Sequence, residues 1–311
     1  MITSGCLCSN FSAPPGKEAK LTKKTLTVAL AQRAPHPIDR PLDAFARDVA
    51  ATVEAHPNIQ LLVYPELHLN GTEHLPEPER ADALEAAAVT LDSDYIRTLG
   101  AIAAEHGIWL CPGSLGERGP AGEFFNTQLL FDGTGALRSR YRKMFPWRPY
   151  EPHQPGTEFI TQGLDGTAIA GLSICYDAWF PEHTRQLAWD GADLILNIVK
   201  TTTPDREQEL VLARANAIVN QNVMASVNCA PPVGRGRSIV VNAEGFVIAE
   251  AGIGEETLVF EFDPAHVAAV RERGTMFSNR MWSQFQEGDA VIPMPLYDGR
   301  IDPKSWTPRS R

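Results

Sequence analysis

The chain has 311 residues, of which 43% are hydrophobic and 21% are charged, and it carries a formal net charge of -10 at pH 7. This acidic balance disfavours nucleic acid and anionic membrane surfaces as partners, and no apolar run reaches the roughly 18 residues of a membrane-spanning helix. The five cysteines, an odd number in a long chain, do not indicate a disulfide framework. We therefore expect a cytoplasmic protein.

The first 24 residues are predicted to form a tail. They contain Gly, Ser, Pro and Lys without apolar periodicity, and they lack the basic start and apolar core of a secretory signal. Cys6 and Cys8 lie within this tail, but no second pair of metal-ligating residues is near them in the sequence. We expect no metal site there.

From Thr25 onward, strand-like and helix-like segments alternate. In chain order, the patterns predict a strand at 25–32, a helix at 41–55, a strand at 61–64, one or two helices within 80–106, and strands at 108–111, 127–131, 137–141 and 171–174. There follow a helix at 181–190, a strand at 194–199, a helix at 206–221, strands at 223–228, 238–241, 245–249 and 257–262, and a short helix opening at Asp263-Pro264. No linker divides the series, so we expect one α/β domain over 25–274 with helices on the sheet faces.

The last segment, residues 275–311, has little regular pattern but contains Trp282, Tyr297 and Trp306. Its length and aromatic content indicate a C-terminal extension that contacts another subunit of an oligomer.

Cys175 lies in the most informative run of the chain, Gly171-Leu-Ser-Ile-Cys-Tyr-Asp-Ala-Trp-Phe-Pro-Glu182. The segment before it is short and apolar, as in a buried strand, and Pro181 suits the first turn of a helix. The cysteine is therefore expected on a sharp turn at the carboxyl end of a strand, where open α/β folds place their sites. A nucleophile fits this position; the alternative is a small buried core residue.

Three charged residues also follow predicted strands. Glu66 comes after a buried strand and Pro65, where desolvation would raise its pKa towards a value suited to proton transfer; the alternative is a cap for the next segment. Lys143 ends a strand before an aromatic, Pro-rich stretch, although a single Lys there is more often solvated. Glu151, eight residues on, is by itself an ordinary loop acid.

These residues suggest one chemistry when they are combined with Cys175. A thiol needs a base to become a nucleophile, and none of the eight histidines lies in a motif typical of a Cys–His pair. A carboxylate with a raised pKa can act as the base instead. A Lys ammonium can stabilise the oxyanion that forms when the thiolate attacks a carbonyl or nitrile carbon.

Glu66, Lys143 and Cys175, in this order and in these local contexts, resemble the Glu-Lys-Cys triad of the nitrilase superfamily of carbon–nitrogen hydrolases. The matching runs are Tyr64-Pro-Glu-Leu67, Tyr141-Arg-Lys143 and 174–182, with further similarity at Phe125-Asn-Thr127, 191–197 and 238–245. The resemblance covers roughly Thr25 to Arg273.

The resemblance implies a four-layer α-β-β-α sandwich and a cofactor-independent mechanism. Cys175 would form a thioester with the substrate acyl group, and Glu66 would act as general base and then as acid. Lys143 and the backbone N–H of Tyr176 would hold the oxyanion, and Glu151 would help to position substrate or water. No metal or organic cofactor is implied, and Cys6, Cys8, Cys111 and Cys229 have no matching role.

Within the superfamily, the resemblance favours an amidase. Cys175-Tyr-Asp177 is more common in amidases than the Cys-Trp-Glu of nitrile-hydrolysing members, and the loop 143–156 resembles that of aliphatic amidases and formamidases. The run after Asp177 is closer to other amidases, and the carboxyl tail is shorter than in aliphatic amidases. The expected activity is hydrolysis of a small carboxamide; the alternatives are a nitrilase, an N-carbamoyl amidohydrolase, or a binding relative without turnover.

Aromatic residues near the catalytic positions are candidates for substrate binding, namely Trp147, Tyr150 and Trp179. If they line the site, they favour a compact, uncharged or apolar acyl group; their alternative role is packing of the loop. The resemblance also implies a homodimer or larger homo-oligomer, formed through the helices that begin at Pro181 and Arg206.

Overall fold

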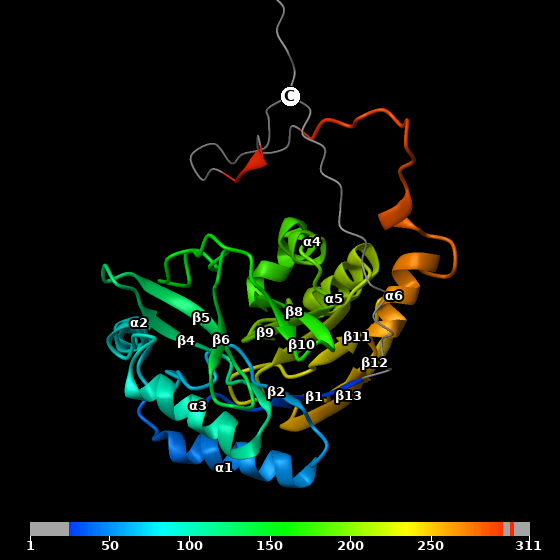
Figure 1. Ribbon diagram of the computed structural model, residues 1–311. Coiled ribbons are helices and arrows are strands. Elements are labelled where there is room, and N and C mark those ends of the chain that lie inside the picture. Colours follow the sequence, from blue (N-terminus) through cyan, green and yellow to red (C-terminus); the bar gives the residue numbers. More distant parts are fainter. Residues whose placement is uncertain (1–24, 295–298, 302–311) are drawn as a thin grey trace, which may run out of the picture.

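The computed structural model describes residues 25–294 and 299–301 (Figure 1). The predicted tail 1–24, with Cys6 and Cys8, lies outside the described residues, as do Tyr297 and Trp306 of the C-terminal extension.

The first of two sheets is built mainly from the amino-terminal half of the chain. The strand order is β13(Glu256–Phe262), β1(Leu26–Gln32), β2(Leu61–Val63), β3(Trp109–Cys111), β5(Phe124–Phe131) and β4(Ser114–Arg118), with β6(Leu137–Arg142) also paired to β5. β1 is parallel to β2, and β2 is parallel to β3, while β13 runs antiparallel to β1.

The second sheet holds the strand that precedes Cys175. Its order is β12(Val247–Glu250), β11(Ile239–Val241), β10(Val223–Asn228), β9(Leu194–Val199), β8(Ala168–Ile174) and β7(Thr161–Leu164). Because β8, β9 and β10 are parallel, the residues that follow them gather at one edge of the sheet. Cys175 follows β8 and Lys200 follows β9 at this edge.

The alternation of side chains along the strands produces four layers. On β1, Val28 and Leu30 belong to the core between the sheets, while Ala29 and Ala31 pack under α1(Leu42–Ala55) and α3(Asp94–His106). On β9, Leu196 faces the same central core, and Ile195 packs under α4(Pro181–Trp189) and α5(Arg206–Asn220). Strand side chains alternate with period two, so each sheet buries both faces. The predicted α-β-β-α sandwich is confirmed (Figure 1).

Two strands were not expected from the sequence. β4 and β7 are short and contain glycine, which weakens the strand pattern; they become strands by pairing with β5 and β8. The region 80–106 contains the end of α2(Glu77–Ala86) and all of α3. The last α-helix of the described residues, α6(Pro264–Arg273), begins after Asp263, whose carboxylate accepts a hydrogen bond of 2.8 Å from the Ala265 N–H.

The described part of the C-terminal extension contacts the outer helices of its own chain. Trp282, in the short 3-10 helix η2(Met281–Ser283), lies 6.1 Å from the ring of Trp189 on α4 and 5.2 Å from the Arg185 guanidinium. No helix among the described residues has the length and apolar character needed to cross a membrane.

Candidate active site

The nucleophile candidate sits on a strained turn. β8 ends at Ile174, and Cys175 begins the 3-10 helix η1(Cys175–Trp179) with a φ of 46°. This left-handed conformation costs a non-glycine residue about 1–2 kcal/mol, and such strain is concentrated at functional sites. The Cys175 residue remains partly exposed. The predicted strand–turn–helix context is therefore confirmed, with η1 inserted before α4.

Glu66 is buried, and its carboxylate accepts hydrogen bonds from three segments of the chain. Its Oε1 atom accepts from Asn126 Nδ2 at 2.8 Å and from Lys143 Nζ at 2.9 Å. Its Oε2 atom accepts from the backbone N–H of Lys200 at 3.0 Å. These contacts fix the carboxylate beyond the carboxyl end of β2.

Lys143 is fully buried rather than solvated. Its backbone N–H donates to the Asn126 carbonyl at 2.9 Å, which continues the β5–β6 pairing by one residue. Its ammonium contacts Glu66 and also donates to Glu151 Oε1 at 2.5 Å. One cation therefore lies between two carboxylates, that of the buried Glu66 and that of the partly buried Glu151.

The structure brings Cys175 into electrostatic contact with this cluster. Burial raises the pKa of the Cys175 thiol well above its ordinary value, and the negative charge of Glu66 raises it further, while Lys143 acts in the opposite direction. The thiol is therefore protonated at neutral pH and needs a base to become a nucleophile.

The charges in the cluster constrain one another. Burial raises the pKa of Glu66, with Glu151 adding to the increase and Lys143 opposing it. Burial alone would lower the pKa of Lys143, but the carboxylates of Glu66 and Glu151 outweigh it and hold that pKa well above its usual range. Glu151 is also desolvated, yet Lys143 and His153 lower its pKa to about 2. At neutral pH Lys143 and Glu151 are charged. Glu66 is the carboxylic acid of the cluster whose pKa is raised, in the direction of neutral pH.

A second buried network supports the turn at Cys175. Asp177 is fully buried and accepts hydrogen bonds from the Tyr141 hydroxyl at 2.7 Å, the Ile174 N–H at 2.9 Å and the Phe145 N–H at 3.0 Å. It thus connects the turn at Cys175 to the residues on both sides of Lys143.

His183 completes this second network. Its Nε2 atom lies 2.7 Å from the Tyr141 hydroxyl. Because that hydroxyl has a single proton and donates it to Asp177, the contact requires His183 to donate from Nε2.

The aromatic candidates lie on two segments. Trp147 and Tyr150 pack on each other with ring centroids 4.4 Å apart, and Tyr150 is 69% exposed. Trp179 lies 5.9 Å from Tyr176 within η1. Their assignment to substrate binding stays a prediction.

Several residues of the site were not singled out from the sequence: Asn126, Lys200, Asp177, Tyr141 and His183. Asn126, Tyr141 and Asp177 lie inside the family-like runs quoted above, but the runs alone gave these residues no role. The Lys200 contribution is a backbone N–H, which side-chain identity does not reveal. Within the described part of the chain, no group of three or more His, Cys, Asp or Glu residues is arranged to hold a metal ion.

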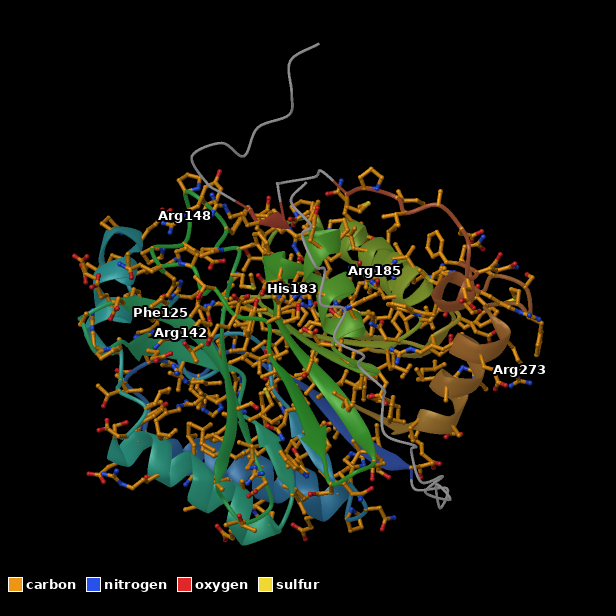
Figure 2. The ribbon with its side chains drawn as sticks, turned by 45° about the horizontal axis from the view of Figure 1, so that its top comes forward. Phe125, Arg142, Arg148, His183, Arg185 and Arg273 are labelled. Atoms are coloured by element: carbon orange, nitrogen blue, oxygen red, sulfur yellow. The ribbon has the colours of Figure 1, made fainter. Side chains whose placement is uncertain are left out.

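Another buried carboxylate, that of Glu117, lies on the face of β5 and β6 opposite to Lys143. Glu117 accepts hydrogen bonds from Thr127 at 2.6 Å and from Arg142 at 2.6 and 3.0 Å. The Arg142 guanidinium lies 3.9 Å from the ring centroid of Phe125, and Figure 2 shows these two residues together, apart from His183.

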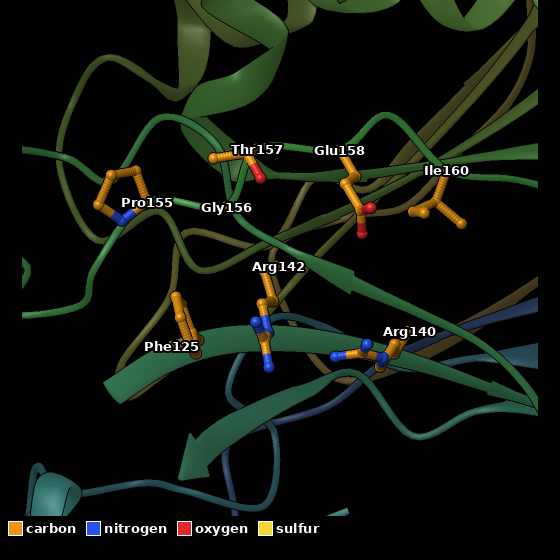
Figure 3. A pocket seen from close by; sticks show the side chains of 8 residues that line it. All are labelled: Phe125, Arg140, Arg142, Pro155, Gly156, Thr157, Glu158 and Ile160. Atoms are coloured by element: carbon orange, nitrogen blue, oxygen red, sulfur yellow. The ribbon is translucent and has the colours of Figure 1, made fainter. Parts of the chain in front are cut away.

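Beside this cluster is a cavity of about 130 Å³ (Figure 3). It is lined by Phe125, Arg140, Arg142, Pro155, Gly156, Thr157, Glu158 and Ile160. Glu66, Lys143 and Cys175 are not among its lining residues.

Comparisons with known proteins identify relatives of this chain. The chain is 34% identical over 210 residues to a formamidase of Pseudomonas syringae pv. tomato, with 66% of this chain and 60% of the formamidase covered. The chain therefore spans about three fifths of the length of that relative.

Solved structures of the nitrilase superfamily share the fold. Saccharomyces cerevisiae Nit3, a member of branch 10 of that superfamily, is 26% identical with a TM-score of 0.73, covering 83% of this chain and 97% of Nit3. A mutant of the amidase from Nesterenkonia sp. AN1, with the acetamide moiety of fluoroacetamide added covalently at its active-site cysteine, is 28% identical with a TM-score of 0.65. That match covers 78% of this chain and 92% of the amidase chain.

The family model of the carbon-nitrogen hydrolases matches residues 27–272, a span that contains the Glu66, Lys143, Glu151 and Cys175 cluster. The chain therefore belongs to the carbon-nitrogen hydrolase family.

Proposed function

We propose that this protein is an amidase that hydrolyses a small carboxamide to a carboxylic acid and ammonia through a thioester on Cys175. The observation that carries the proposal is the buried ammonium of Lys143 between Glu66 and Glu151, in electrostatic contact with the thiol. The formamidase and amidase relatives support the choice of an amide as substrate.

In the first step, Glu66 takes the proton of the Cys175 thiol as the sulfur attacks the amide carbonyl carbon. The S–C bond forms, and the carbonyl electron pair moves onto oxygen. Lys143 and the backbone N–H of Tyr176 stabilise this oxyanion, because donors fixed in a desolvated site need no reorganisation when the charge develops. The raised pKa of Glu66 suits this role, since it makes the carboxylate a better proton acceptor.

The tetrahedral intermediate then collapses. The C–N bond breaks, and Glu66 returns the proton to the departing nitrogen. Ammonia is released, and the acyl group remains bound to Cys175 as a thioester. A water molecule attacks that thioester while Glu66 accepts its proton. The C–S bond breaks, the carboxylic acid is released, and the thiolate recovers a proton from Glu66. Glu151 keeps Lys143 charged and in place throughout the cycle.

The sandwich over 25–274 forms the catalytic unit of this proposal. We infer that Trp147, Tyr150 and Trp179 contribute to an acyl pocket for a compact, uncharged group. Assembly as a homodimer or larger oligomer through α4 and α5, and a cytoplasmic location, stay predictions.

The test measures ammonia release from simple aliphatic amides, aromatic amides, N-carbamoyl acids and nitriles, with Cys175→Ala as control. We expect ammonia release from amides, and we expect it to be lost in Cys175→Ala. The dependence of the rate on the length of the acyl chain measures the size of the acyl pocket. Turnover of nitriles, or carbon dioxide release from N-carbamoyl acids, would move the same triad to another reaction. Amide turnover retained by Cys175→Ala would contradict the thioester mechanism.

A further inference from the structure

His153 is a buried titratable side chain that the proposed mechanism does not use. It is fully buried, and neither ring nitrogen has a hydrogen-bond partner among the described residues. The Oε2 atom of Glu151 also lacks a partner there. The two groups face each other, with His153 Nδ1 3.7 Å from Glu151 Oε2.

The surroundings hold the ring in this position. The His153 ring packs against Phe124 with centroids 4.5 Å apart and the ring planes tilted by 40°, and the N–H of Gln154 donates to the Phe124 carbonyl at 2.7 Å. The guanidinium of Arg148 donates to the His153 carbonyl at 2.7 Å and reaches the Glu151 carbonyl at 3.5 Å. With backbone and ring both fixed, the ring stays next to Glu151.

Two buried polar atoms that face each other without partners are costly unless they interact, because each has lost its hydrogen bonds to water. At 3.7 Å the contact is longer than an ordinary hydrogen bond and is electrostatic in this structure. A displacement of less than about 1 Å would bring it to hydrogen-bond length.

We propose that His153 is a positioning residue for Glu151, with its Nδ1–H donating to Glu151 Oε2 while Oε1 accepts from Lys143. This inference rests on the proposed function, in which Glu151 holds Lys143 at the oxyanion. A carboxylate bound at both oxygens has one orientation, so the Lys143 ammonium has one position. The lowering of the Glu151 pKa by His153 agrees with this arrangement. His153 acts through Glu151 and touches no reacting atom.

The test compares two substitutions that separate hydrogen bonding from packing. His153→Phe keeps an aromatic ring against Phe124 but removes the donor, whereas His153→Asn keeps an N–H near the place of Nδ1 but removes the ring. We expect His153→Phe to lower kcat on the best amide by about tenfold, and His153→Asn to stay within about threefold of the wild type. KM should change little in both variants, because the effect concerns the oxyanion. Any result in which the Asn variant is not faster than the Phe variant overturns the proposal.

A second measurement does not depend on turnover. Nitrogen-15 spectra of histidine-labelled protein should show His153 as the Nδ1–H tautomer, with a signal that shifts in Glu151→Gln. An Nε2–H tautomer, or a signal unmoved by Glu151→Gln, would overturn the contact. If the wild type hydrolyses no amide while the tautomer is as expected, the proposed function fails and the His153–Glu151 contact stands.

Discussion

The strands β5 and β6 separate two buried ionic clusters with opposite composition. On one face, the single ammonium of Lys143 lies between the carboxylates of Glu66 and Glu151. On the other face, the single carboxylate of Glu117 lies between the guanidinium groups of Arg142 at 2.6 Å and Arg140 at 3.6 Å. Lys143 and Arg142 are neighbours in the sequence, so the alternation of side chains along the strand creates the separation.

The two clusters differ in what their charges can do. Glu117 is matched by a bidentate guanidinium, and its arginines reach solvent, with side chains 26% and 49% exposed. Each oxygen of the Glu117 carboxylate therefore accepts a hydrogen bond from the Arg142 guanidinium. The Lys143 cluster has one carboxylate in excess, no exposed cation and a thiol beside it. The pKa values of Glu66 and Cys175 are therefore raised above their ordinary values. Displaced equilibria of this kind are typical of sites that transfer protons.

The strongest way to test this contrast is to neutralise one glutamate in each cluster. We expect Glu66→Gln to lower kcat by about a thousandfold or more, because it removes the base that accepts the thiol proton. Mass spectrometry after mixing with substrate should show no acyl adduct on Cys175. An adduct that forms at the wild-type rate would remove Glu66 from the role of base.

Removing the shared cation should have the next largest effect. Lys143→Met would leave the carboxylates of Glu66 and Glu151 without their shared counterion, and we expect kcat to fall by about a hundredfold to a thousandfold. The free energy of unfolding at neutral pH should fall by about 3 kcal/mol. Steady-state kinetics and denaturant titration measure the two effects; wild-type kcat in a folded variant would exclude Lys143 from oxyanion binding.

The Asp177 network predicts a smaller loss that acts through geometry. In Asp177→Asn, one of the oxygens that accept from Ile174, Phe145 and Tyr141 becomes an NH₂ group and meets donors. We expect kcat to fall about tenfold to a hundredfold, because the turn at Cys175 shifts relative to Lys143. Tyr141→Phe, which removes one of the three donors and leaves the carboxylate, should lose less. Equal losses in the two variants would contradict the central role of Asp177.

The pH dependence of activity tests the displaced pKa of Glu66 directly. Burial raises that pKa above the ordinary 4.5, and the base must be ionised to act, so activity should fall as pH drops through the raised value. The acidic limb of kcat/KM should therefore lie above pH 4.5. The raised pKa affects folding in the opposite direction to activity. Because the folded state binds this proton more tightly than the unfolded state, the free energy of unfolding falls as pH rises and Glu66 ionises. An acidic limb at or below the ordinary value would count against Glu66 as the titrating base.

The smallest effect on activity is expected for the matched control, Glu117→Gln. Because the side-chain partners of Glu117 are Thr127, Arg142 and Arg140, none of which belongs to the Lys143 cluster, kcat should stay within about threefold of the wild type. The free energy of unfolding should fall by about 1–3 kcal/mol, because the contacts of this buried side chain with the arginines are weakened. A loss of activity comparable to that of Glu66→Gln would show that the two faces of β5 and β6 are not independent.

The sequence predicted most of the fold because the local patterns were consistent with it. The strands at 194–199 and 223–228 have the bounds expected from their apolar runs, and the turn at Cys175 follows from an apolar strand ahead of Pro181. Glu66, Lys143 and Cys175 were identified together through family-like runs. The residues alone left each with an alternative role, including a solvated position for Lys143, which the structure shows to be wrong.

The tertiary structure decided how these groups act on one another. The Glu66 carboxylate is held by Asn126, Lys143 and the backbone of Lys200, which lie 60, 77 and 134 residues away in the sequence. No local pattern encodes contacts between such distant segments, since they depend on how the two sheets pack. Burial of one ammonium between two carboxylates, and the resulting shift of proton affinities, arises only when the sandwich has formed and water has been excluded.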